Sequence, residues 1–145
     1  MRITTKGRYA LRACLALAKL GQDGTPVSIR ELSGYEKISP VFLEQIFFKL
    51  RKAGIISSVR GPGGGFRFAK SLEETNLKAI IEASDENVEL TPCTGGKDGC
   101  NRDSECLAHT VWLEATALLN DYLENTSLQS LKDRFPSFFE RSTEK

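Results

Sequence analysis

The sequence contains a single histidine and four cysteines among its 145 residues, and no pair of acidic residues stands in a recognisable catalytic setting. It also lacks a long hydrophobic run, because the most apolar stretch, Tyr9 to Leu20, is interrupted by Arg12 and Lys19 and is too short to span a bilayer. No small-residue cleavage site follows an apolar core near Met1, so no secretory signal is expected. These absences argue against an enzyme, a membrane protein and a secreted protein. They predict a cytoplasmic protein whose cysteines are kept reduced.

The net charge of the chain is also small, at +1, but its two halves carry opposite charges. Residues 1–72 hold 13 Lys and Arg against 4 Asp and Glu, whereas residues 73–145 hold 7 against 15. The first half therefore carries +9 and the second half −8. A basic half of this kind indicates contact with a polyanion, although a basic face folded against an acidic one would give the same counts.

Apolar spacing and capping residues predict helices in the first half. One helix runs from about Thr5 to Leu20 and is ended by Gly21. A second begins after Ser28, whose hydroxyl can cap free backbone amides while Glu31 completes a capping box. The residues expected to be buried are Leu11, Cys14, Leu15 and Ala18 in the first helix and Leu32 in the second.

A third helix is predicted from the Ser39 cap and the following Pro40 to about Ala53. Its other face carries polar side chains, among which Glu44 can accept a hydrogen bond from the amino group of cytosine and Gln45 can pair with adenine. These two residues are either base readers or solvated residues on a helix surface. The apolar residues expected to form the buried stripe of this helix are Leu43, Ile46, Phe47 and Leu50.

A β-hairpin is predicted after the third helix. Ile55 to Arg60 is a short β-branched run, Gly61 to Gly65 is rich in glycine, and Phe66 to Lys70 alternates apolar and basic residues. Because neither Gly-Lys-Ser/Thr nor a helix follows the glycines, they do not predict a phosphate loop. They favour a tight tip whose backbone can approach DNA, or else an ordinary flexible turn.

Three helices followed by a two-stranded ribbon is the order of a winged helix-turn-helix, in which the third helix enters the major groove of DNA. The predicted fold class is mainly α, with a two-stranded β wing and a long C-terminal dimerisation helix. Basic side chains of the first half are expected to contact phosphates, with Arg8, Lys52 and Arg67 adding charge. The candidate DNA-binding residues are Arg2, Lys6, Ser39, Val41, Phe42, Glu44, Gln45, Lys49, Arg51, Arg60, Gly61 and Gly63.

In the second half, a short helix is predicted over Leu77 to Ala83 and a long one from Cys106 to about residue 125. The long helix carries a broad apolar stripe, which indicates either pairing with a twin helix in a second subunit or an intramolecular core helix. Pairing would suit a pseudo-palindromic DNA site. The stripe consists of Leu107, Val111, Leu118 and Tyr122, with Ala115, Leu119 and Leu123 close beside it.

Three of the four cysteines and the only histidine lie close together in the sequence, as Cys93, Cys100, Cys106 and His109. Thiolates and an imidazole are ligands for zinc or an iron–sulfur centre. Zinc sites usually contain a tight Cys-x2-4-Cys pair, which is missing here, and open glycine-containing loops favour a larger cluster. A transient disulfide switch, zinc and spectator thiols remain alternatives. Cys14 is expected to be a core residue.

We therefore expect residues 1–72 to form a winged helix-turn-helix DNA-binding region. Residues 73–145 are expected to contain a cluster-binding loop at about 88–105, a dimerisation helix at about 106–125 and a short C-terminal tail.

Several stretches occur in an order that is characteristic of one family: Met1 to Ala10, Phe42 to Phe47, Leu50 to Ile55, Val59 to Gly65, and the cysteine and histidine set followed by Trp112. With these motifs the chain resembles the IscR-like iron–sulfur transcription regulators of bacteria over nearly its whole length.

The resemblance implies a homodimeric winged-helix regulator that holds a [2Fe–2S] cluster on Cys93, Cys100, Cys106 and His109 and controls iron–sulfur assembly or redox genes. The implied partners are double-stranded DNA with a pseudo-palindromic site, a second copy of the chain and the iron–sulfur assembly machinery, with no membrane. Glu44 matches a family position that is tied to DNA choice by the cluster-loaded and cluster-free forms.

Alternatives to this cofactor and signal remain open. Related regulators that sense nitric oxide hold a [4Fe–4S] cluster and have an acidic residue where this chain has Arg8. A [4Fe–4S] cluster, zinc, and a cluster-free regulator that responds to thiols or a metabolite through a partner protein are the alternatives.

Overall fold

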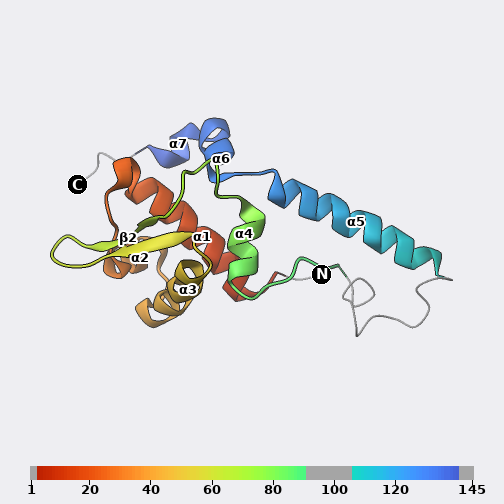
Figure 1. The fold of residues 1–145 in the computed structure, drawn as a ribbon, viewed down its shortest axis with the longest axis horizontal. Helices are drawn as coiled ribbons and strands as arrows, with labels where there is room; N and C mark the ends of the chain where they lie inside the picture. Colours follow the sequence, from red (N-terminus) through yellow and green to blue (C-terminus); the bar gives the residue numbers. More distant parts are fainter. Residues whose placement is uncertain (1–2, 91–105, 141–145) are drawn as a thin grey trace.

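The computed structural model describes residues 3–90 and 106–140. It confirms the predicted fold class, because helices dominate and the described strands form one two-stranded antiparallel sheet (Figure 1). The elements in chain order are α1 (Thr5–Leu20), the 3-10 turn η1 (Gln22–Gly24), α2 (Ile29–Glu36), α3 (Pro40–Lys52), β1 (Ile56–Val59), β2 (Gly65–Phe68), α4 (Leu77–Ala83), α5 (Leu107–Glu124), α6 (Leu128–Arg134) and α7 (Pro136–Phe139).

The predicted capping residues begin α2 and α3. Ser28 Oγ accepts a hydrogen bond of 3.1 Å from the backbone N–H of Glu31, and Ser39 Oγ accepts one of 3.2 Å from that of Phe42. Each hydroxyl thus satisfies a backbone donor that the helix itself cannot satisfy. Pro40 occupies the first turn of α3, where its missing N–H removes no helical hydrogen bond. Local sequence alone therefore defines where these two helices begin.

The core forms where α1 packs against α2, α3 and α4. In α3 the buried stripe is the predicted one, Leu43, Ile46, Phe47 and Leu50. In α1 the prediction is partly wrong, because Leu11 and Leu15 are only half-buried while Leu17 is fully buried. The helix meets neighbours on several sides, and its alanines allow their close approach. These fully buried alanines are Ala10, Ala13 and Ala16.

The wing is an antiparallel hairpin whose pairs run from Ile56 with Phe68 to Val59 with Gly65. A backbone bridge joins it to the body, since Val27 and Phe66 exchange hydrogen bonds of 2.9 and 2.8 Å. Gly65 is required at this bridge because a Cβ there would collide with the backbone of Val27. The base of the wing is therefore fixed to the helical body.

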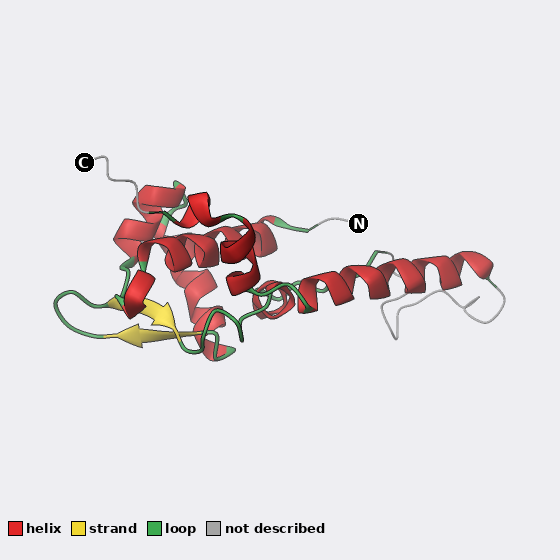
Figure 2. Cartoon of the chain, turned by 90° about the horizontal axis from the view of Figure 1, so that it is seen from above, coloured by secondary structure: helices red, strands yellow, loops and turns green. Residues whose placement is uncertain are grey.

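The helices after the wing divide between the body and a projecting arm. α4 packs on α1, and α6 and α7 return to the body, so the expected tail after residue 125 is largely helical. α5 contacts α4 near its C-terminal end and otherwise extends away from the body, on the side opposite the wing (Figures 1 and 2). None of the described helices combines the length and the apolar character needed to cross a membrane.

Neighbouring phenylalanines test the orientation of α3. Phe47→Ala is expected to lower the free energy of unfolding by about 3–5 kcal/mol, because it empties a fully buried position. Phe48→Ala should change it by less than about 0.5 kcal/mol, since that ring is 57% exposed. Urea unfolding followed by circular dichroism at one protein concentration measures both. Equal losses in the two variants would contradict the assigned faces of α3.

Candidate functional site

The solvent-facing side of α3 presents the predicted base readers. Glu44 and Gln45 are exposed, and they line a shallow hollow together with Val41, Phe48 and Lys49. The opposite side of the helix is buried in the core, so these side chains lie on the face of α3 that the described residues leave open to a partner. Such a face offers a carboxylate, a carboxamide and apolar groups to base edges.

Phe42 lies closer to the core than the other predicted contacts of α3. Its ring is half-buried against the core and meets the ring of Tyr9 edge-on, with the ring centroids 5.5 Å apart. This packing holds the start of α3 against α1. Ser39, the neighbouring predicted contact, is exposed, and its hydroxyl oxygen is engaged by the N-terminal cap.

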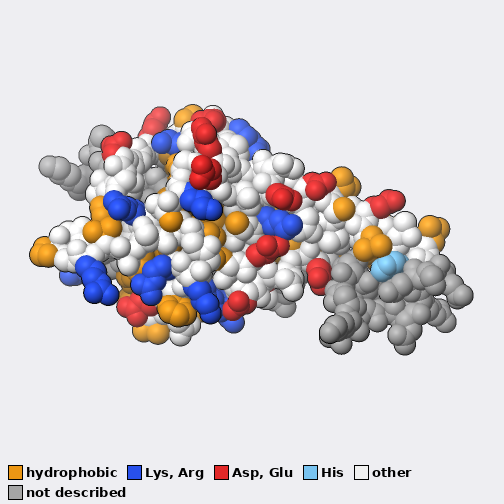
Figure 3. Space-filling view, in the orientation of Figure 1, with side chains coloured by type: hydrophobic (Ala, Val, Ile, Leu, Met, Phe, Trp, Pro, Cys, Tyr) orange, Lys and Arg blue, Asp and Glu red, His pale blue; other side chains and the backbone are white. Residues whose placement is uncertain are grey.

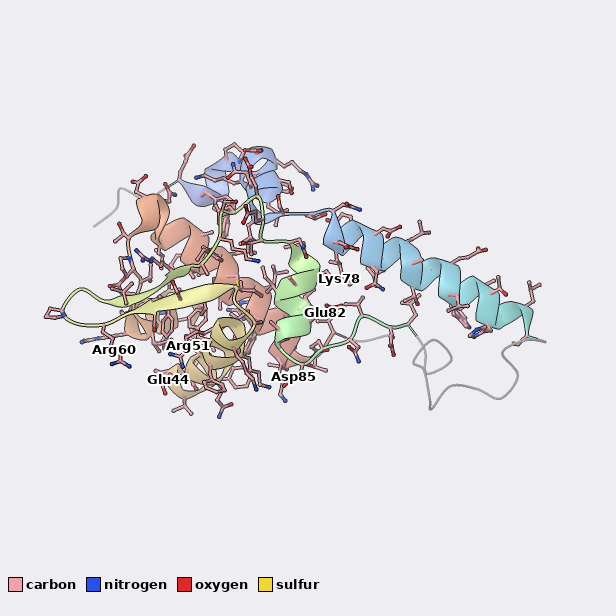
Figure 4. The ribbon with its side chains drawn as sticks, in the orientation of Figure 1. Glu44, Arg51, Arg60, Lys78, Glu82 and Asp85 are labelled. Atoms are coloured by element: carbon pink, nitrogen blue, oxygen red, sulfur yellow. The ribbon has the colours of Figure 1, made fainter. Side chains whose placement is uncertain are left out.

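Basic side chains surround this face of α3. Figure 3 shows Lys and Arg gathered over α3 and the wing, whereas α5 carries Asp and Glu and no Lys or Arg. In Figure 4, Arg51 lies beside Glu44 and Arg60 lies at the wing. Arg51 also stands over the ring of Phe48, 5.9 Å from its centroid. The described residues thus keep the charge separation that the sequence predicts.

The remaining predicted DNA contacts lie at the two ends of this surface. Lys6 is exposed in the first turn of α1. Gly61 and Gly63, in the turn of the wing, have positive φ values of 96° and 74°, which side chains rarely adopt. Arg2 lies outside the described residues.

Besides Glu44, a second acidic residue reaches the basic surface from outside α3. The carboxylate of Asp85, in the turn after α4, lies 2.5 Å from the ammonium of Lys49 on α3. The hydrogen bond and charge of Lys49 lower the pKa of the Asp85 carboxyl, and the more distant charges of Lys6 and Lys52 act in the same direction. Asp85 therefore stays ionised and pairs with a side chain that the sequence predicts to contact phosphate.

The residues that follow Asp85 contact two more helices. Glu86 is buried beside Gly7 of α1, where its Cγ lies 3.1 Å from the position that a Cβ on Gly7 would take. The carbonyl of Val88 accepts a 3.1 Å hydrogen bond from the side-chain amide of Asn120 in α5. Residues 85–88 thus connect α3, α1 and α5 on the chain that leads to Cys93.

Two of the four predicted metal ligands stand at the start of α5. Cys106 is the residue before the helix, and its carbonyl accepts a 3.1 Å hydrogen bond from the backbone N–H of His109. The imidazole Nδ1 of His109 is buried, and it has no hydrogen-bond partner in the part of the chain that the structure describes. Such a nitrogen is costly unless it binds something, which fits a metal ligand. Cys93 and Cys100 lie outside the described residues.

Cys14 differs from these cysteines, as the sequence predicts. It is fully buried in α1, and burial raises the pKa of its thiol to about 12. A neutral, enclosed thiol is neither a good nucleophile nor a ready metal ligand.

The apolar stripe of α5 faces solvent in the single chain. Leu107 is 80% exposed and Leu118 is 72% exposed, with Val111 and Tyr122 also exposed between and beyond them. Leu119 and Leu123, which the sequence places close beside this stripe, instead face the other way and pack against the core. The expectation that α5 is purely an intramolecular core helix therefore does not hold for the described residues.

Sequence reasoning missed two contributors to the surface on α3. Phe48 lies on its exposed face, one helical turn after Glu44, and that spacing could have identified it. Asp85 gives no such signal, because it is 36 positions away from Lys49 in the chain and only the folded structure brings the two together.

Comparisons with known proteins agree with this architecture. The family model Rrf2, described as an iron-dependent transcriptional regulator, matches residues 3–134. The HTH-type transcriptional regulator IscR of Aliivibrio salmonicida is 44% identical over 131 residues, which cover 90% of this chain and 77% of that relative.

Solved structures show the same fold. CymR of B. subtilis, described as the global cysteine regulator, superposes with a TM-score of 0.79 at 25% identity, covering 92% of this chain and 98% of that one. IscR of T. potens superposes with a TM-score of 0.75 at 24% identity, covering 98% and 94%, and this likeness concerns the fold alone. The resemblance predicted from the motifs is thus confirmed, and the chain belongs to the Rrf2 family of helix-turn-helix transcriptional regulators rather than to an enzyme family.

Proposed function

We propose that this regulator binds DNA as a homodimer and senses iron–sulfur status through a [2Fe–2S] cluster on Cys93, Cys100, Cys106 and His109. Through this cluster it controls iron–sulfur assembly or redox genes. The observation that carries the sensing role is the buried Nδ1 of His109, which has no hydrogen-bond partner among the described residues and lies one helical turn from Cys106. The relatives named IscR and the family's description as iron-dependent support the same assignment.

The DNA-binding part of the proposal uses the exposed face of α3 and the wing. α3 enters the major groove, where Glu44 and Gln45 meet base edges and Phe48 can contact a thymine methyl group. Arg51 beside this face and Arg60 on the wing neutralise phosphates, which positions the protein without specifying sequence. The separation of basic and acidic surfaces supports this orientation, because it turns the acidic helix α5 away from the polyanion.

Salt dependence tests the DNA-binding surface. Affinity for duplex DNA should fall about 10³- to 10⁵-fold between about 50 and 200 mM salt if about 6–10 phosphates are contacted. Arg51→Gln and Arg60→Gln should each reduce the slope of log affinity against log salt by about 1. Lys78→Gln is the matched control, because Lys78 lies on α4 and faces Glu82 and Glu124. Fluorescence anisotropy measures all four proteins, and a flat response of the unaltered chain would exclude this surface.

The cluster part of the proposal depends on the donor set. Three thiolates and one imidazole suit a [2Fe–2S] centre. Such a cluster would form only when iron and sulfide are available, and oxidants would destroy it. His109 and Cys106 are held at the start of a regular helix, so their spacing is fixed before any ligand arrives. A [4Fe–4S] cluster and zinc are the competing occupants, and they differ from it in iron and sulfide content.

Anaerobic purification tests the cluster. The protein should be brown, with visible charge-transfer absorption and about two labile iron and two labile sulfide per chain, whereas a [4Fe–4S] cluster would give about four of each. His109→Cys should retain a cluster but shift its spectrum and reduction potential, because a histidine ligand raises the potential. Cys14→Ala is the control and should leave the spectrum unchanged, since that thiol is enclosed in the core. A colourless protein that binds only zinc would refute the assignment, and an unshifted His109→Cys spectrum would remove His109 from the ligands.

The homodimer follows from the exposed stripe of α5. A row of apolar side chains this exposed on a protruding helix marks an interaction surface. A second copy presents the same row, so an isologous pair would cover both at once. It would also place two copies of α3 in one assembly, as a palindromic site requires.

Charge placed on the stripe should break the dimer. Leu118→Glu is expected to convert the protein to a monomer and to weaken its DNA binding, because each buried Glu would have to lose its hydration. Ala117→Glu is the matched control, since this exposed neighbour points about 100° around the helix from Leu118. Sedimentation analysis gives the mass of each protein. A Leu118→Glu variant that remains dimeric, or an unaltered chain that is monomeric, would contradict the proposed interface.

A further inference from the structure

Asp85 stands among the lysines of the DNA-binding surface. Its carboxylate pairs with Lys49 of α3 at 2.5 Å, and Lys6 of α1 and Lys52 of α3 are near enough for their charges to act on it. Figure 4 shows Asp85 at the end of α4 that lies beside α3. A carboxylate in this position offers Lys49 what a DNA phosphate would offer, an anionic oxygen at hydrogen-bond distance.

We propose that Asp85 is a positioning residue for DNA binding: it holds the ammonium of Lys49 in an internal ion pair and thereby competes with a phosphate for that ammonium. This inference rests on the proposed contact between α3 and DNA. Lys49 is 32% exposed while Asp85 is 70% exposed, so a phosphate can approach the pair from the solvent side. Binding then exchanges one anionic partner of Lys49 for another.

The backbone around Asp85 keeps its carboxylate in place. Its N–H donates a 3.1 Å hydrogen bond to the carbonyl of Glu82, which ties it to the last turn of α4. Glu86 is buried beside Gly7, and Val88 is bound by Asn120, so the next residues are fixed on α1 and α5. Asp85 is therefore not a freely moving surface acid, and its distance from Lys49 is set by three other helices.

The position of Asp85 also makes a clean substitution possible. Its φ of 65° lies in the left-handed region, which Asn adopts about as readily as Asp. Asp85→Asn thus removes the charge while preserving the turn. Glu82→Gln, one turn earlier on α4, removes an equal charge that faces Lys78 instead of Lys49 and serves as the control for net charge.

The experiment measures the affinity of cluster-free protein for a duplex of arbitrary sequence and about three helical turns, across a range of salt concentrations. Asp85→Asn is expected to bind about two- to fivefold more tightly at low salt, the range of an exposed ion pair. Its slope of log affinity against log salt should be steeper by about 1, because no freed Asp85 carboxylate is left to take up a cation when a phosphate binds Lys49. In a Lys49→Gln background the same substitution should give a clearly smaller gain and no steeper slope.

Each other outcome overturns the proposal. The gain in DNA affinity from Asp85→Asn could equal the gain from Glu82→Gln, or could be the same with and without Lys49. Either result would show that Asp85 acts only through its contribution to the net charge. An unchanged affinity would show that Asp85 does not compete with DNA for the ammonium of Lys49. If the unaltered protein binds without salt dependence, the DNA contact of α3 itself fails, which is a different result. Thermal unfolding of each variant checks that the fold is retained.

Discussion

α3 can bury only one of its faces against the core, and this constraint determines which side chains the DNA-binding surface presents. Phe47 and its stripe neighbours fill the space between α3 and α1, while the ring of Phe42 closes the edge against Tyr9. Rotating the helix by one residue in one direction would expose Phe47, and rotating it in the other would bury Glu44, so the packing leaves one orientation. The wing is then tied to the body through Val27 and Phe66, which fixes a second contact point relative to the first. Core packing thus determines which side chains can meet DNA.

Charge follows the same division, with Glu44 and Asp85 as the acidic exceptions on the basic side. Basic side chains dominate α3 and the wing, and α5 carries Asp and Glu but no Lys or Arg. Asp85 crosses this boundary, and it does so on the segment that continues toward Cys93. The same segment is held by Asn120 on α5, fourteen positions after Cys106. In the proposed function, residues 85–88 are therefore the part of the chain that touches both the DNA-binding helix and the helix that carries two cluster ligands.

Local features could be predicted from the sequence, and features that depend on several partners could not. The Ser28 and Ser39 caps, the stripe of α3 and the hairpin each follow from a few neighbouring residues, and the structure has them as expected. The buried face of α1 was only partly predicted, because a helix with neighbours on several sides has no single apolar stripe. The ion pair between Lys49 and Asp85 joins residues far apart in the chain, and no periodicity reports it.

α5 illustrates why two roles can share one helix. Leu118 lies nine positions after His109, and at about 100° per residue the two side chains point to opposite sides of the helix. His109 therefore shares its side with Asn120 and Leu123, which meet the rest of the chain, while Leu118 belongs to the exposed stripe. A cluster at His109 and a second subunit on the stripe would not compete for space. In the proposed function, the ligand side and the paired stripe are therefore separate surfaces of one helix, and Asn120 joins the ligand side to Val88.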